Sequence, residues 1–122
     1  MAEAQFNLGT FYQTGTLGVN KNYYEASKWF KLAAEQGFLE AQYNLGLNYF
    51  NGEGVAKNYN EAIRWWKAAA KQGYAAAYNN IGYYYESIER NYTEAKKWYE
   101  QAIELGYLEA RTNLIHLLGK MK

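Results

Sequence analysis

The side chains most regularly placed for chemistry are four asparagines, which recur at equivalent positions of a repeated pattern: Asn7, Asn44, Asn80 and Asn113. Each asparagine side chain carries one hydrogen-bond acceptor and two donors. A row of such amides, spaced by a repeat, can pair with successive peptide groups of an extended ligand without reading its sequence. In the alternative interpretation, each amide bonds to the adjacent helix and fixes the packing. The two roles are compatible, and the sequence leaves both open.

Other residues share the predicted helix face of these amides. If Leu45 marks the centre of the buried side and each residue turns the helix by about 100°, the opposite side carries mostly polar residues. In the four helices it holds Glu3, Phe6, Asn7, Thr10 and Thr14; Glu40, Tyr43, Asn44, Leu47 and Asn51; Ala76, Asn79, Asn80, Tyr83 and Ser87; and Glu109, Thr112, Asn113 and His116. The candidate binding residues are the four asparagines with Phe6, Tyr43, Leu47, Asn51, Asn79 and Tyr83.

A catalytic or metal site is not predicted. The chain has no Cys and no Asp, its only histidine is His116, and its only serines are Ser27 and Ser87. A metal site needs several ligands close together, and a nucleophile needs a base beside it. We therefore expect no enzyme activity, no metal and no cofactor, and we place His116 on the surface of the last helix.

Composition and charge narrow the class of protein. The 122 residues suit one domain, and 49% hydrophobic with 20% charged residues indicates a folded chain. The net charge of +1 gives no broad positive field, so nucleic acid and anionic membranes are not expected partners. The chain shows neither a signal peptide nor a transmembrane segment. We expect either a protein that stays where it is made or a piece of a longer chain, and the compartment is unknown.

One phrase, Asn-Tyr-x-Glu-Ala-x-x-Trp-aromatic, occurs three times, at 22–30, 58–66 and 91–99. Its tryptophans are separated by 36 and 33 residues. A second phrase precedes each copy, as "AQFNLGTFY", "AQYNLGLNY" and "AYNNIGYYY", and a partial fourth copy, "ARTNLIHLL", covers 110–118. A catalytic site is normally assembled once, whereas a repeated phrase indicates a stacked unit. The chain therefore consists of three units and an additional half unit.

Each unit is predicted to contain two helices. The second helix begins after an asparagine cap with glutamate three residues later, and it ends at a glycine. The first helix carries a glycine in its middle, at Gly9, Gly46 and Gly82, which costs about 1 kcal/mol relative to alanine. That repeated cost predicts a close approach of the partner helix. The fourth copy has Ile115 there, which indicates that no partner helix packs on it.

Large and basic side chains recur along the predicted second helices. The tryptophans are expected in the core or between helices, with one ring of Trp65 and Trp66 partly exposed, because adjacent helical residues point about 100° apart. The basic residues are interpreted either as a solvated face or as the docking site of an acidic partner. They are Lys28, Lys31, Arg64, Lys67, Lys71, Lys96 and Lys97.

These features resemble the Sel-1-like repeat family, which is related to the tetratricopeptide repeats. The resemblance lies in "AQYNLGLNYFNGEGVAKNYNEAIRWWKAAAKQGY" of the second unit, with its loop of Gly52, Gly54 and Val55 and its ending at Gly73. The first unit carries one extra residue in this loop. The third unit lacks both loop glycines and is shorter.

The resemblance implies an all-α fold: a right-handed α-solenoid of antiparallel helix pairs, with the first helix of each pair on the concave side. We expect a single domain over 1–122, with units at about 2–38, 39–74 and 75–107 and a capping helix at 108–118. Members of the family serve as adaptors that hold other proteins together, without catalysis.

We therefore predict a monomeric scaffold that binds a protein or peptide segment in the concave groove. The alternative is a structural module that associates with itself through the ends of the stack or through exposed aromatic rings.

Overall fold

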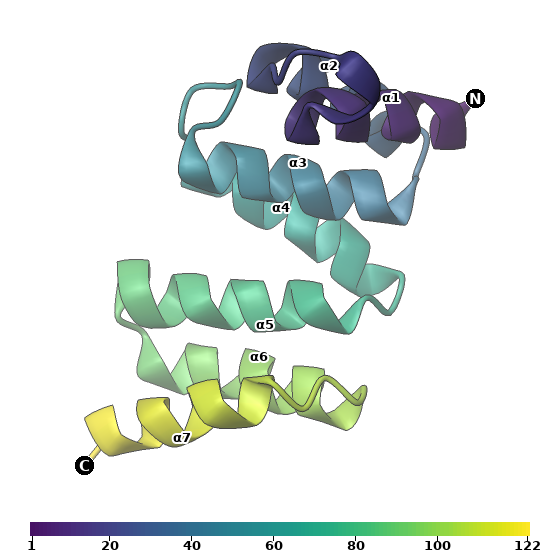
Figure 1. Ribbon diagram of the computed structural model, residues 1–122. Helices are drawn as coiled ribbons and strands as arrows, with labels where there is room; N and C mark the ends of the chain where they lie inside the picture. The colour runs from purple at the N-terminus through teal and green to yellow at the C-terminus, as the bar shows by residue number, and fades with distance from the viewer. The chain divides into compact units, whose positions relative to one another are not determined.

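The computed structural model describes all residues, 1–122, and contains helices and no strands. The Cα positions divide into two compact units, Met1–Ala69 and Ala70–Lys122, which are described separately. None of the helices is long and apolar enough to cross a membrane. The first unit contains α1 (Ala2–Thr14), η1 (Thr16–Gly18), α2 (Tyr23–Glu35), α3 (Leu39–Asn51) and most of α4 (Tyr59–Lys71). Consecutive helices within it fold back on one another (Figure 1).

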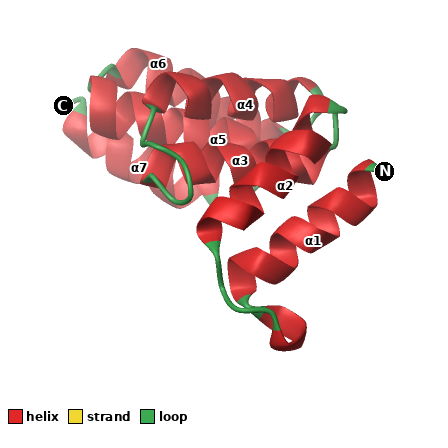
Figure 2. Ribbon diagram, turned by 90° about the horizontal axis from the view of Figure 1, so that it is seen from above, coloured by secondary structure: helices red, strands yellow, loops and turns green.

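The second unit is built from α5 (Ala75–Tyr84), the π-helical turn η2 (Tyr85–Glu89), α6 (Tyr92–Glu104) and α7 (Ala110–Lys120). Figure 2 shows that helices joined by short loops account for the whole chain. The turn η2 ends at Arg90, whose φ of 54° is left-handed. The turn η2 stands where the second repeat has its glycine loop after α3. The shorter third repeat therefore connects its two helices by extending the first one.

The predicted starts of the second helices are confirmed. The side-chain oxygens of the capping asparagines accept a bond from the backbone N–H three residues later, at 3.0, 3.1 and 3.1 Å for Asn22, Asn58 and Asn91. The glutamates at those positions point differently from a capping box, because each forms an ion pair with the basic residue three positions further on. These exposed pairs contribute little stability, whereas each cap contributes about 1 kcal/mol.

The predicted glycine ends of these helices are also confirmed. Gly37, Gly73 and Gly106 have φ values of 87°, 90° and 93°, in the left-handed region. The next residue then donates its N–H five residues back, from Phe38 to the Ala33 carbonyl at 3.1 Å and from Tyr107 to the Ala102 carbonyl at 2.9 Å. This pair of features is the Schellman motif.

The mid-helix glycines lie against aromatic rings of the second helices. A Cβ atom at Gly9 would be 2.6 Å from the Phe30 ring, and one at Gly82 would be 2.7 Å from the Tyr99 ring. A Cβ at Gly46 would lie closer still to the ring of Trp66. The predicted close approach is therefore confirmed in all three repeats.

The cores combine small alanines with a few large rings. In the first unit Ala26, Phe30, Ala41 and Leu45 are fully buried and pack with Trp65. The expectation that one of the two adjacent tryptophans is partly exposed was wrong, because Trp65 and Trp66 are only 7% and 2% exposed. The Arg64 guanidinium lies 4.6 Å from the Trp65 ring and covers it, while Trp66 fills the space left by glycine.

The last helix begins at Ala110, two residues later than predicted, because residues 108–109 form a turn. It packs on α6 through Ala110 and Leu117, which are fully buried. Its opposite face carries Ile115, which is 71% exposed. This isoleucine occupies the position that glycine holds in the other first helices, and no ring packs on it.

Candidate functional site

The amide face of the first unit is formed by α1 and α3. Asn7 on α1 and Asn51 at the end of α3 are exposed, and Asn44 is half-buried. Tyr43 and Leu47, also half-buried, lie on the same side of α3 as Asn44. The backbone carbonyl of Tyr43 accepts a bond of 3.2 Å from the indole N–H of Trp66, which fixes α3 against the next helix. The amides on this face are accessible to water or to a ligand.

Phe6 also packs on the core, a role that the sequence did not predict. Its ring centroid lies 5.7 Å from that of Phe30 and 5.2 Å from that of Phe38, and the ring packs against the buried core of the first unit. The sequence had placed it only on the outward face. Phe6 is half-buried, so part of its ring contributes to packing.

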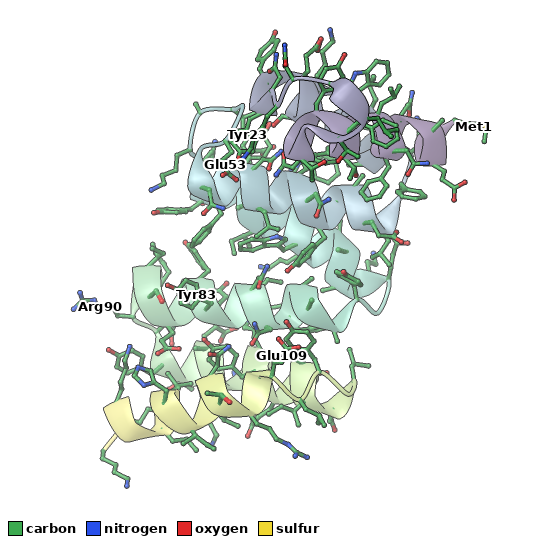
Figure 3. All side chains as sticks on the ribbon, in the orientation of Figure 1. Met1, Tyr23, Glu53, Tyr83, Arg90 and Glu109 are labelled. Atoms are coloured by element: carbon green, nitrogen blue, oxygen red, sulfur yellow. The ribbon has the colours of Figure 1, made fainter.

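The amide face of the second unit is formed by α5 and α7. Asn79, Asn80 and Asn113 are half-buried, and Tyr83, labelled on α5 in Figure 3, is 50% exposed. The Asn113 side-chain amide donates a bond of 2.9 Å to the Asn79 side-chain oxygen. At this position the alternative role holds, because the amide joins two first helices directly.

The chemistry of these faces is hydrogen bonding and ring contact. The ten candidate binding residues are six asparagines, two tyrosines, a phenylalanine and a leucine, none of which is charged at neutral pH. Such a set can bind peptide groups and apolar side chains. His116 is exposed on α7.

A buried polar network in the first unit was missed by the sequence analysis. Asn48, fully buried, donates to the Ser27 hydroxyl at 2.8 Å, and Ser27 donates to the Glu53 carbonyl at 3.0 Å. Gln13 reaches Asn48 from α1 at 3.5 Å. The sequence did hold a sign of this network: Asn48 aligns with Phe11 and Tyr84 of the other two repeats, so a polar residue occupies a position where the other repeats have an aromatic one.

A second buried cluster, in the second unit, was also missed. Glu86 is 5% exposed and accepts bonds from the Tyr99 hydroxyl at 2.7 Å and from the Lys120 ammonium at 2.9 Å. Burial, and then the bond to Glu86, raises the pKa of Tyr99 well above its ordinary value. The same carboxylate raises the pKa of Lys120. The cluster ties α7 to η2 and α6.

The helix pairs and their repeated glycine–ring contacts define an α-helical repeat protein. The Sel1 repeat family matches residues 2–38, 39–74 and 75–107, and the chain belongs to that family. Its fold class is accordingly the all-α solenoid of helix pairs, with three repeats followed by a C-terminal helix.

Solved structures of related proteins agree with this assignment. A Sel1 repeat protein from Oxalobacter formigenes is 44% identical, with a TM-score of 0.81 over 93% of this chain and 47% of its own. A protective antigen of uropathogenic Escherichia coli strains, described as having an SLR fold, is 40% identical, with a TM-score of 0.79 over 87% of this chain and 23% of its own. The chain thus spans less than half the length of either.

A more distant structure is an immunity protein from Pseudomonas aeruginosa, 25% identical, with a TM-score of 0.58 over 89% of this chain and 54% of its own. A comparison with curated proteins finds no significant match.

Proposed function

We propose that the chain is a protein-interaction scaffold whose first helices bind an extended protein or peptide segment. Sel1 repeat proteins are generally protein-interaction scaffolds of a non-catalytic type. The observation that carries the proposal is that an asparagine recurs at one position of the first helices, exposed at Asn7 and half-buried at Asn44 and Asn80. The amides would pair with the peptide groups of the segment, and the rings of Tyr43 and Tyr83 would receive its side chains. We propose neither catalysis nor a nucleic-acid partner.

Paired substitution of two row asparagines tests this function. Peptides selected from a random display library for binding to the wild-type chain serve as probes, and their affinities are measured by fluorescence anisotropy. Each lost hydrogen bond is worth about 1 kcal/mol. Asn44→Ala with Asn80→Ala is therefore expected to weaken binding by about tenfold or more and to change the melting temperature by only a few degrees.

The matched control is Asn20→Ala with Asn60→Ala, which removes two exposed amides outside the row. These variants should bind as the wild type does. A large fall in melting temperature for the row variants, with peptide affinity unchanged, would contradict the binding role and favour the packing role.

The alternative function is self-association through an end of the repeat array. It is favoured by the exposure of Leu108, Ile115 and Leu118, which are 54%, 71% and 40% exposed. The aromatic rings of the second helices are a weaker basis, since Trp65 and Trp66 are buried. Size-exclusion chromatography at several concentrations separates the two functions, because elution that does not depend on concentration weakens the alternative.

A further inference from the structure

A preformed pocket opens in the first unit, away from the row of amides. It has a volume of about 240 Å³ and lies between α2, α3 and the loop that follows α3. A hollow of about 310 Å³ on α2 shares Lys28 and Lys31 with it and adds Leu32 and Glu35. The pocket itself is lined by Tyr24, Ser27, Lys28, Lys31, Leu45, Tyr49, Gly54 and Val55.

The loop wall of this pocket is fixed by close packing. Gly54 has a φ of 77°, and a Cβ there would lie 2.6 Å from the Ser27 hydroxyl and would overlap the Tyr23 carbonyl oxygen. The loop backbone therefore lies directly on α2, in the region where Figure 3 labels Tyr23 and Glu53. The Ser27 hydroxyl bonds to the Glu53 carbonyl and accepts from buried Asn48. A ligand would meet a wall that is already in place.

The interior of the pocket is apolar and its rim is cationic. Leu45 is fully buried at the base, Tyr49 and Val55 are half-buried, and Tyr24 is 69% exposed at the edge. Lys28 and Lys31, one turn apart on α2, supply the charge. No carboxylate is among the lining residues.

The surrounding carboxylates leave this rim positive. Glu25 lies 3.7 Å from the Lys28 ammonium and is 30% exposed, whereas the Lys28 side chain is 60% exposed, so Glu25 offsets the charge of Lys28 only in part. Glu61 acts electrostatically on Lys31, but its two oxygens bond to Arg64 at 3.0 and 3.2 Å. Glu35 lines only the adjoining hollow.

We propose that this pocket binds an acidic peptide segment in which a glutamate or aspartate neighbours an apolar residue. The apolar side chain would enter above Leu45 and Val55, and the carboxylate would bond to Lys28 and Lys31. The volume is below the range of about 300–1,000 Å³ typical of small-molecule and cofactor sites, and it suits one or two side chains. The site is separate from the amide face, so either proposal can fail alone.

The third repeat provides an internal comparison. Lys97 occupies the position of Lys28 and has the same 3.7 Å pair with the glutamate three residues before it, Glu94. However, the position of Lys31 is taken there by Glu100, and the loop lacks both glycines. Substitution of Lys97 therefore removes an equivalent lysine without touching the pocket.

Two labelled peptides test the proposal, Gly-Glu-Leu-Glu-Phe-Gly and its counterpart with glutamine in place of glutamate. Their affinities are measured by fluorescence anisotropy, and the site is located by amide chemical shifts in ¹H–¹⁵N spectra. The variants are Lys28→Gln with Lys31→Gln and, as the matched control, Lys71→Gln with Lys97→Gln. Both pairs lower the net charge equally.

We expect the glutamate peptide to bind the wild type about tenfold more tightly than the glutamine peptide, since charge-assisted bonds are the stronger kind. Lys28→Gln with Lys31→Gln should abolish this preference, the control pair should retain it, and the shifts should centre on Ser27, Leu45, Gly54 and Val55. Equal weakening by both pairs would overturn the proposal by showing nonspecific charge attraction. The proposal would also be overturned if no saturable binding were found at millimolar peptide. It would likewise be overturned if the chemical shifts of these residues changed with protein concentration alone, because that would show that the pocket holds a second copy of the chain.

Discussion

At the residue scale, Asn113 differs from Asn7 although both occupy the same position of a repeat. The Asn113 amide bonds to Asn79 at 2.9 Å, whereas Asn7 is exposed. We therefore expect Asn113→Ala to lower the free energy of unfolding by about 1 kcal/mol and Asn7→Ala to change it by less than about 0.5 kcal/mol. Urea denaturation followed by circular dichroism measures both. Equal losses would show that all positions of the row are structural.

The buried hydroxyl of Tyr99 makes the stability of the chain depend on pH in the alkaline range. Burial and the bond to Glu86 raise its pKa, so the unfolded chain loses this proton near the ordinary tyrosine pKa of about 10 while the folded chain retains it. The free energy of unfolding then falls as the pH rises above about 10, by up to about 1.4 kcal/mol per pH unit for one proton. Lys120, with its raised pKa, acts in the same direction.

Tyr99→Phe should therefore flatten this decline, in addition to lowering stability at neutral pH through the lost bond to Glu86. Urea denaturation at several pH values between about 9 and 11 gives the slope. Tyr24→Phe is the control, because Tyr24 is 69% exposed and its removal should leave the slope unchanged. Identical slopes for wild type and Tyr99→Phe would mean that Tyr99 ionises normally in the folded chain.

At the element scale, the contact between the helices of a pair depends on glycine. Gly82→Ala would place a Cβ 2.7 Å from the Tyr99 ring. Overpacking costs about 1–3 kcal/mol, which exceeds the gain of about 1 kcal/mol in helix propensity. We expect the variant to unfold at lower urea concentration than the wild type.

Gly119→Ala is the matched control in the same unit, because nothing lies within 4 Å of a Cβ built there. It should leave stability unchanged or raise it by less than about 1 kcal/mol. If both substitutions stabilise the chain, the close approach of α5 and α6 imposes no requirement for glycine.

The sequence predicted helix boundaries well where the cause is local. An asparagine cap bonds three residues ahead and a terminal glycine allows a left-handed turn, so residues close in the chain determine where α2, α4 and α6 begin and end. The mid-helix glycines were informative because their repetition indicated a contact. Helical periodicity alone was enough to predict which helix face carries the asparagines.

Features determined by distant residues could not be predicted in this way. Glu86 forms an ion pair with Lys120, 34 positions further along the chain. Nothing in the sequence around either residue predicts this pairing. Trp65 is buried because Arg64 folds over it and because it joins a core made by α2 and α3. The Asn113–Asn79 bond likewise depends on the position of α7 relative to α5. Helical periodicity does not determine that position. The pocket needs a loop from one repeat packed on a helix of another.

At the scale of the whole molecule, the exposed apolar side chains of α7 are the main basis for self-association. Because α7 has 11 residues, it is about 16 Å long and about 10 Å wide, so its exposed face is far smaller than the roughly 800 Å² per partner of a stable interface. His116, Thr112 and Arg111, all exposed, interrupt the apolar residues. This surface is too small for a tight dimer by itself.

We therefore expect a monomer at about 10–100 μM, with any dimer appearing only near millimolar concentration. Sedimentation velocity on the wild type and on Ile115→Glu measures this. The control is Leu17→Glu, which adds the same charge at a residue that is 77% exposed in η1. Loss of a millimolar dimer in Ile115→Glu alone would locate the contact on α7. A dimer at about 10 μM that Ile115→Glu dissociates would instead show that α7 forms a real interface, and self-association would become the favoured function over peptide binding.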